Sequence, residues 1–414
     1  MHEDVSRTDD SDATWQHGIF EHAPGKCTRE AWDVNEQAHN LTDWSQHYDQ
    51  YGQGAFYGRI DELHLPGMQV FKEYTSQALD QQCHVWPDSL WIGIPAERQP
   101  CRINGYALEA GDIMCQPGGH DFALTTPDTF AIHCLVLRRD WLLEVAGESA
   151  LTLLEGDPQH TMRLGVTQGT RRGVTFLMDR LIKRLGPGFE VQVHQGILSL
   201  AVAAILEEWT PLTDRYPSYH HRRQVVERVR EHVNRGEPAP VSIESLCRIA
   251  HVSQRTLHNS FTSILGLSPM QFIRFNRLNQ VRRRLCDPLS TSTIGQVASD
   301  WGFYHLGQFA QDYRRLFGES PSGTQARYRA RESVAVKIGG AICVLSRNRL
   351  DRSSKPNHFS TAAEMVGLRN KYRLNGDLRA VHAGYRDRRG HIDAHRELLH
   401  NRKADDNDMQ LLVM

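Results

Sequence analysis

Two stretches decide the fold: VSIESLCRIAHVSQRTLHNSFTSILGLSP (residues 241–269) and STIGQVASDWGFYHLGQFAQDYRRLFGESP (residues 292–321). Each begins with a side chain that can cap a helix, Ser242 or Thr293, followed by apolar residues at helical spacing. A short turn and a second amphipathic run follow. Each copy closes on Gly-x-Ser-Pro, in which the glycine can end one helix and Ser-Pro can begin the next. We therefore predict two helix-turn-helix units, over residues 242–265 and 293–317.

The two stretches form an internal duplication. From the second helix onward a constant offset of 52 residues relates the pairs Leu257/Phe309, Phe261/Tyr313, Leu265/Phe317, Gly266/Gly318, Ser268/Ser320 and Pro269/Pro321. A repeat that keeps apolar, glycine, serine and proline positions in step indicates one module used twice.

The second helix of each copy has a polar face. At 100° per residue, the second helix of the first copy has Leu257, Phe261 and Ile264 on one side, which we expect to be buried. Side chains that can bond to base edges in a DNA major groove lie on the opposite side. We predict base contacts by Arg255, His258 and Asn259 in the first unit and by Tyr304, His305, Gln308 and Gln311 in the second.

Charge is divided unevenly along the chain, although its formal net charge is only −1. Residues 218–330 hold 16 arginines, no lysine and eight acidic residues, residues 331–414 are also basic, and residues 1–217 are acidic. A basic segment joined to an acidic one suggests that only one part meets a polyanion such as DNA. We predict phosphate contacts by Arg274, Arg277, Arg314 and Arg315, with Arg282, Arg283 and Arg284 adding positive charge.

The length of 414 residues allows two ordinary domains, and the composition (40% apolar, 23% charged) is that of a globular protein. Short strand-like runs between Gly, Pro and Asp turn signals fill residues 58–137, and helical patterns fill residues 141–209. We predict an α+β protein: a sensor domain over residues 21–210, with a mixed β-barrel or sandwich and flanking helices, and an all-α DNA-binding domain over residues 222–330. A linker at 211–221 and disordered segments at 1–20 and 331–414 complete the expected organisation.

No run approaches the about 20 apolar residues of a membrane span, and the acidic start lacks the apolar core of a secretory signal. The eight cysteines are scattered without a CxxC pair, which is typical of reduced thiols. These features predict a cytoplasmic, nucleoid-associated protein with no membrane partner.

Several motifs resemble those of a known family. The run WGFYHLGQFAQDYRRLFGESPS (residues 301–322) resembles the C-terminal signature of AraC/XylS-type transcription regulators, and RLNQVRRRL (residues 277–285) resembles the helix that links their two units. The runs VFKEYTSQAL (70–79), VWPDSLWIGIPA (85–96) and PGGHDFALTTPD (117–128) resemble regulators of ethanolamine-utilisation operons. The resemblance covers about residues 20–327.

The resemblance implies a transcriptional activator that responds to ethanolamine together with adenosylcobalamin. It also implies an operator of double-stranded DNA, RNA polymerase and small-molecule effectors as partners, with a homodimer as one assembly. A regulator of another catabolic operon, with a different effector, remains an alternative.

The residues themselves suggest only weak effector candidates: Trp86 and Trp91 as walls of a pocket, with Phe122 and Phe130, and His120 as a cobalt ligand. Aromatic core packing and a simple turn are the simpler explanations of the same residues. Asp88 and Asp121 are candidate partners for an amine. A metal-dependent β-barrel enzyme would need a set such as His84, His133 and Glu73, but no HxH or HxxE spacing supports it. We therefore predict a protein that is not an enzyme, with no metal site.

Overall fold

The computed structural model describes residues 24–96, 99–109, 111–155, 162–183, 190–211, 218–235, 241–287 and 290–330. The two segments that we predict to be disordered, 1–20 and 331–414, lie outside these ranges.

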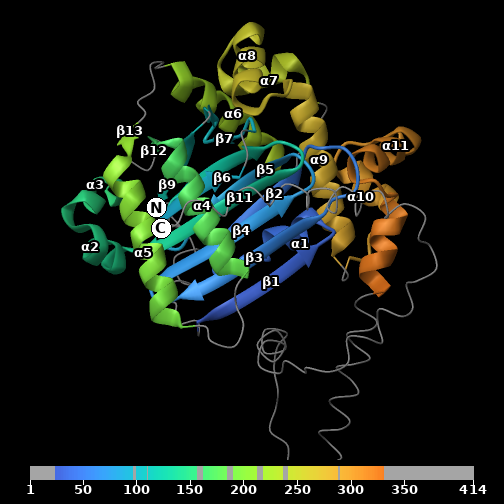
Figure 1. The fold of residues 1–414 in the computed structure, drawn as a ribbon. Coiled ribbons are helices and arrows are strands. Elements are labelled where there is room, and N and C mark those ends of the chain that lie inside the picture. The colour runs from blue at the N-terminus through green and yellow to red at the C-terminus, as the bar shows by residue number, and fades with distance from the viewer. Residues whose placement is uncertain are drawn as a thin grey trace, which may run out of the picture. The chain divides into compact units, whose positions relative to one another are not determined.

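Two antiparallel sheets form the centre of the N-terminal part (Figure 1). The larger sheet has the order β1 (Gly25–Ala31), β3 (Gly58–Leu65), β4 (Met68–Thr75), β11 (Phe130–Arg138), β6 (Ser89–Pro95), β9 (Asp112–Pro117), β12 (Met162–Gly165), β13 (Thr210–Pro211). The smaller sheet has the order β2 (Ser45–Gln50), β5 (Leu79–His84), β10 (Asp121–Thr126), β7 (Arg102–Ile103), β8 (Tyr106–Ala107).

The sheets share an apolar core. Alternate residues of the larger sheet, such as Phe71, Trp91 and Ile132, pack with Tyr48 and Phe122 of the smaller sheet. The helix α1 (Val34–Ala38) adds Val34 and Ala38 to this core. The sandwich alternative of our prediction therefore describes the domain. The barrel alternative is wrong, because the strands form two separate sheets and do not close into one.

The other face of the larger sheet packs against helices (Figure 1). These are α2 (Arg139–Ala146), the 3-10 helix η2 (Gly147–Ala150), α3 (Leu151–Leu154), α4 (Gln168–Lys183) and α5 (Val191–Glu208). Met178 of α4 and Val202 of α5, for example, join Val70, Ile92 and Leu135 of the sheet in one core. In the described part of the chain, no helix has both the length and the apolar character that crossing a membrane requires.

Three local expectations need correction. Residues 24–50 contain two strands that the sequence did not indicate, β1 and β2, and β12 interrupts the stretch for which we predict helices only. The helix α6 (Ser218–Asn234) begins inside the expected linker. The strand β1 escapes detection because it is an edge strand on which only Ala31 is buried, so it carries no apolar alternation.

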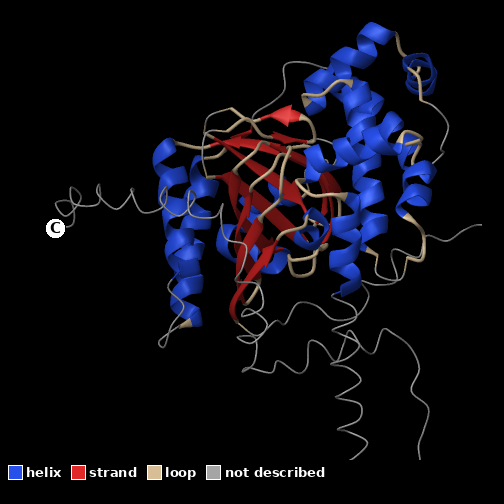
Figure 2. Ribbon diagram, turned by 90° about the vertical axis from the view of Figure 1, so that its right-hand side faces the viewer, coloured by secondary structure: helices blue, strands red, loops and turns tan. Residues whose placement is uncertain are grey.

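The C-terminal part is helical, as predicted. It contains α6, α7 (Ile243–Ala250), α8 (Gln254–Leu265), α9 (Pro269–Cys286), α10 (Ile294–Asp300), α11 (Leu306–Phe317) and a further helical stretch over residues 321–330. It has two apolar cores, one around α6, α7 and α8 and one around α10 and α11, and α9 contributes to both. Figure 2 shows the strands between the helices α2–α5 and the C-terminal helices.

Candidate DNA-binding surface

The first helix-turn-helix unit is built by local signals in its sequence. Ser242 caps α7 by accepting a hydrogen bond from the backbone N–H of Ser245, and Ser253 caps α8 in the same way through Thr256. Between the helices, His251 adopts the left-handed conformation at φ 56°. Gly266, at φ 73°, ends α8. These boundaries agree with the predicted unit at 242–265.

The second unit repeats the same devices with one extra residue in its turn. Thr293 caps α10 in a reciprocal contact with Gln296, and Gly318, at φ 71°, ends α11. The left-handed position in the turn is taken by Gly302, at φ 80°. Its offset from His251 is 51 residues, whereas the starts of α8 and α11 differ by 52. The extra residue therefore falls within the turn, after the left-handed position.

Both second helices carry an exposed polar face above a buried apolar one. In α8, Leu257, Phe261 and Ile264 are buried. Arg255 and Asn259 are exposed, and His258 is half-buried. In α11 and the turn before it, the predicted base contacts are all exposed: Tyr304, His305, Gln308 and Gln311. The arrangement gives two equivalent polar helix faces, each fixed to its own apolar core.

A buried carboxylate, Asp312, lies beside the second polar face, and no sequence pattern indicates its role. Asp312 accepts a hydrogen bond from Gln308 Nε2 at 2.9 Å through Oδ1, and it pairs with the guanidinium of Arg274 through Oδ2. Arg274, a predicted phosphate contact, is thus tied to α11, although its side chain remains about half exposed. Of the other predicted phosphate contacts, Arg314 and Arg315 are exposed, while burial lowers the pKa of the half-buried Arg277.

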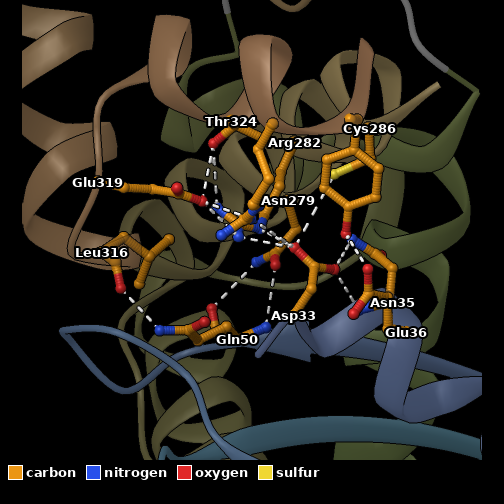
Figure 3. A network of polar contacts seen from close by, with 12 residues as sticks. Asp33, Asn35, Glu36, Gln50, Asn279, Arg282, Cys286, Leu316, Glu319 and Thr324 are labelled. Carbon is orange, nitrogen blue, oxygen red and sulfur yellow. Dashed lines mark hydrogen bonds and ion pairs between the residues drawn. The ribbon is translucent and has the colours of Figure 1, made fainter. Parts of the chain in front are cut away.

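Two other arginines of α9 are withdrawn from solvent: Arg282 is buried (Figure 3) and Arg283 is half-buried. The Arg282 side chain is only 3% exposed and bonds to Asp33 Oδ2 at 2.7 Å and Glu319 Oε1 at 2.8 Å. Arg283 pairs with Asp49 and donates to the backbone oxygen of Tyr48 at 2.9 Å. Acidic side chains of the N-terminal domain therefore neutralise two arginines for which we predict a role at DNA phosphates. Arg284 remains exposed.

The N-terminal domain also contacts α9 and α11 through uncharged groups (Figure 3). The backbone N–H of Gln50 donates to Asn279 Oδ1 at 3.0 Å, and Asn279 Nδ2 donates back to the Gln50 carbonyl at 3.0 Å. The side chain of Gln50 donates to the carbonyl of Leu316, the second-last residue of α11, at 2.7 Å. These contacts hold the end of α11 and the middle of α9 against the last residue of β2.

A third acid–arginine pair involves α6, which shares an apolar core with α7 and α8. Arg230 of α6 bonds to Asp80 of β5 at 2.9 Å, and both side chains are buried. Tyr51 also donates to Asp80 at 3.0 Å and packs edge-on against Phe272 of α9. These contacts therefore join α6 to the smaller sheet and α9 to Tyr51, the residue that follows β2.

The effector candidates are dispersed. Trp86 and Trp91 are buried in the core between the sheets, as are Phe122 and Phe130, whereas His120 lies exposed in the turn before β10. Asp88 and Asp121 are exposed, and Asp121 pairs with His84 at 2.7 Å.

Glu73 is a buried carboxylate that bonds to Tyr48, a residue of the same core as the tryptophans. It accepts hydrogen bonds from Gln37 Nε2 at 2.8 Å and from the Tyr48 hydroxyl at 3.3 Å. Burial raises the pKa of Glu73 to about 7, although both hydrogen bonds act in the opposite direction. The sequence placed Glu73 only in a metal-site alternative.

That metal-site alternative finds no support. His133 bonds to Asp179 at 2.9 Å, His84 bonds to Asp121, and Glu73 lies with Gln37 and Tyr48. Among the residues that the structure describes, no three histidine, cysteine or acidic side chains are placed to hold a metal ion.

Comparison with known proteins identifies the C-terminal segment. Residues 246–327 match the family model of a helix-turn-helix domain. Over 102 residues, 24% of this chain, the sequence is 39% identical to a XylDLEGF operon transcriptional activator of Pseudomonas putida. The match spans 30% of that activator's length.

Solved structures also match about a quarter of the chain. One is a probable AraC family transcriptional regulator from Rhodopseudomonas palustris, 37% identical, covering 25% of this chain and 97% of that one with a TM-score of 0.24. Another is the DNA-binding domain of AdpA in complex with a target DNA, 30% identical, covering 26% of this chain and 95% of that one with a TM-score of 0.24.

Proposed function

We propose that the protein is a sequence-specific transcriptional activator of the AraC/XylS type, because residues 246–327 match a helix-turn-helix family model and 24% of the chain is similar to a XylDLEGF operon transcriptional activator. The observation that carries the proposal is the pair of exposed polar faces on α8 and α11, each fixed to its own core and joined by α9. Each face has the size and chemistry to read base edges in a major groove. Arg255, His258 and Asn259 would read one half-site, and Tyr304, His305, Gln308 and Gln311 the other.

The phosphate contacts follow from which arginines remain exposed. Arg314 and Arg315 lie at the end of α11 and are free to approach the backbone of DNA, and Arg274 and Arg277 are the further candidates on α9. A protein of this kind works on operator DNA in the cytoplasm and recruits RNA polymerase. We propose a homodimer as its assembly, with the exposed side chains Val193 and Leu200 of α5 as candidate contacts.

The effector part of the proposal is ethanolamine together with adenosylcobalamin, and the target is an ethanolamine-utilisation operon. It is supported by the resemblance of residues 70–96 and 117–128 to regulators of such operons. An ammonium group needs a carboxylate or an aromatic face. Glu73 offers a buried carboxylate, and the nearby core holds Trp91 packed against Phe122 with ring centroids 4.7 Å apart. His120 is the exposed imidazole that would suit cobalt.

The test follows DNA binding and corrin absorbance in one titration. A binding site is first selected from random duplex DNA with the purified protein. Adenosylcobalamin is then added with and without ethanolamine, and operator affinity is measured beside the corrin spectrum. We expect both signals to change and the two effectors to act together. If a defined site is selected but neither compound changes the signals, the proposal of a DNA-binding regulator stands and the proposed effectors are wrong. If no site is selected, the proposal of a sequence-specific regulator is wrong.

A further inference from the structure

Asp312 is an unexpected residue on a helix that is to meet DNA. Its carboxylate lies inside α11 with only 5% of the side chain exposed, and DNA is a polyanion that repels negative charge. The exposed Gln308 lies one helical turn earlier, so the two side chains share one side of the helix. Arg274 approaches the same carboxylate from α9, 38 residues away in the sequence. One acid thus joins a candidate base-reading side chain to the linker helix.

The hydrogen bond fixes which way the Gln308 amide is turned. A glutamine amide has a donor nitrogen and an acceptor oxygen, and only the nitrogen can donate to a carboxylate. Since Nε2 donates to Asp312 Oδ1 at 2.9 Å, Oε1 takes no part in this contact. Oε1 and the second N–H of Nε2 remain for DNA. Adenine presents a complementary pair in the major groove, the N6 amino group as donor and N7 as acceptor.

Arg274 neutralises the negative charge that Asp312 would otherwise place near DNA. Its guanidinium neutralises Asp312, so the acid can hold Gln308 without presenting a net negative charge to the phosphates. The guanidinium also fixes the carboxylate from a second helix. Gln308 is thereby ordered before DNA arrives, which reduces the conformational entropy that binding must remove.

The first unit lacks this arrangement, which provides an internal comparison. At the 52-residue offset, Gln308 corresponds to Thr256 and Asp312 to Ser260. The Ser260 hydroxyl donates to the backbone carbonyl of Thr256 at 2.8 Å. It therefore bonds to the helix backbone and holds no side chain of the polar face.

We propose that Asp312, neutralised by Arg274, is a positioning residue that orients the Gln308 amide to read an adenine in the half-site of the second unit. The inference rests on the proposed function, because it requires α11 to face DNA. It predicts that Asp312 acts on the choice of base through Gln308 and has little influence on affinity for DNA in general.

The experiment measures base preference at every position of a selected site, by competition between duplexes, for the full chain and its variants. We expect Asp312→Asn to reduce preference at the base pair that Gln308→Ala also affects, by about fivefold or more, the lower end for one bidentate contact. Affinity for a nonspecific duplex should stay the same or rise. In the double variant that combines Gln308→Ala with Asp312→Asn, the second substitution should not change the base preference further, because the side chain that Asp312 orients is already absent.

Two control variants separate position from charge and packing. Asp300→Asn removes an exposed acid from the same unit, and Ser260→Ala alters the corresponding buried position of the first unit. Both should leave the base preference unchanged. If Asp312→Asn does not fold, Arg274→Gln replaces it as the test. This substitution removes the cation that pairs with Asp312, and it lies at a half-exposed position that tolerates change better. It should weaken the same preference and also reduce affinity for all sequences, because the carboxylate is no longer neutralised.

The outcomes are distinguishable. An unchanged preference in Asp312→Asn, or in Arg274→Gln where the former does not fold, overturns the inference while Gln308→Ala still shows a base contact. An equal loss at all positions in Asp312→Asn overturns it as well, since that is the result of a structural role. No effect of Gln308→Ala on any base overturns both the inference and the placement of Gln308 in the proposed function.

Discussion

Glu73 is a single residue whose surroundings oppose its ordinary ionisation. It lies between the two sheets with Gln37 and Tyr48 as hydrogen-bond donors, and burial raises its pKa to about 7. Below pH about 4.5 the carboxyl is protonated in the folded and the unfolded chain, so burial has no ionisation cost. Between pH 4.5 and 7 the unfolded chain loses the proton first. The folded state is therefore destabilised as pH rises, by about 3 kcal/mol in total.

We expect Glu73→Gln to stabilise the protein relative to the wild type at pH 8 and to have a much smaller effect at pH 4.5. The reason is that glutamine has no proton to lose. Urea unfolding at the two pH values measures the difference, with Glu144→Gln as a control on the exposed face of α2. A stability change of the same size at both pH values would show that the Glu73 carboxylate is not the group that titrates.

Residue roles were predictable where they depend on neighbours in the sequence. The outer faces of α8 and α11 follow from helical periodicity, and the structure exposes the predicted side chains, apart from the half-buried His258. The role of Asp312 was not predictable, because Arg274 is 38 residues away. Arg282 was assigned to phosphates for the same reason: its partner Asp33 is 249 residues away, and only the folded chain brings them together.

At the scale of elements, the glycines that end α8 and α11 form a matched pair with different surroundings. Both adopt the left-handed conformation, at φ 73° for Gly266 and 71° for Gly318. A Cβ added at Gly318 would lie 2.6 Å from the backbone nitrogen of Ala55 in the N-terminal domain. At Gly266 its nearest neighbour would be the end of the Arg102 side chain at 3.9 Å.

We expect Gly266→Ala to reduce the free energy of unfolding by about 1–2 kcal/mol, the cost of a left-handed alanine. Gly318→Ala should cost clearly more, because the new methyl group also displaces the loop around Ala55. Chemical denaturation of the two variants measures both values. Equal losses would mean that this loop does not pack against the end of α11.

Some helices and strands could be predicted from short sequence patterns, and others could not. Caps, left-handed glycines and apolar stripes predicted α7, α8, α10 and α11 to within a residue or two. The strand β2 carried no such signal, since its last three residues, Tyr48–Gln50, are buried in part against α9 rather than in an apolar core alone. Polar residues that are buried by a distant element look like a surface in the sequence.

For the whole molecule, the N-terminal domain holds α9 through buried charges. Burial would raise the pKa of Asp33, but Arg282 and the hydrogen bonds from Arg282 and Asn35 lower it below its usual value. An acid with a lowered pKa stabilises the fold at pH values above its usual pKa, and this contribution is lost as the pH falls through the folded value. Acid should therefore weaken this contact.

We expect Arg282→Met to destabilise the protein by about 3–5 kcal/mol, because it leaves Asp33 buried without its cation and removes a partner of Glu319. Arg284→Met, at an exposed position of the same helix, should change stability by less than about 0.5 kcal/mol. Thermal unfolding of both variants tests the pair. A loss in Arg282→Met no larger than in Arg284→Met would contradict the buried ion pair.

The proposed function requires that α8 and α11 of one chain read separate half-sites. The most direct measurement selects DNA sites from a random library with the wild type, Arg255→Ala and Gln308→Ala. We expect two half-sites about one helical turn apart, with each variant relaxing base preference in one of them only, by about 1–3 kcal/mol. Selected sites that are identical for all three proteins, or that both variants relax at the same positions, would contradict it.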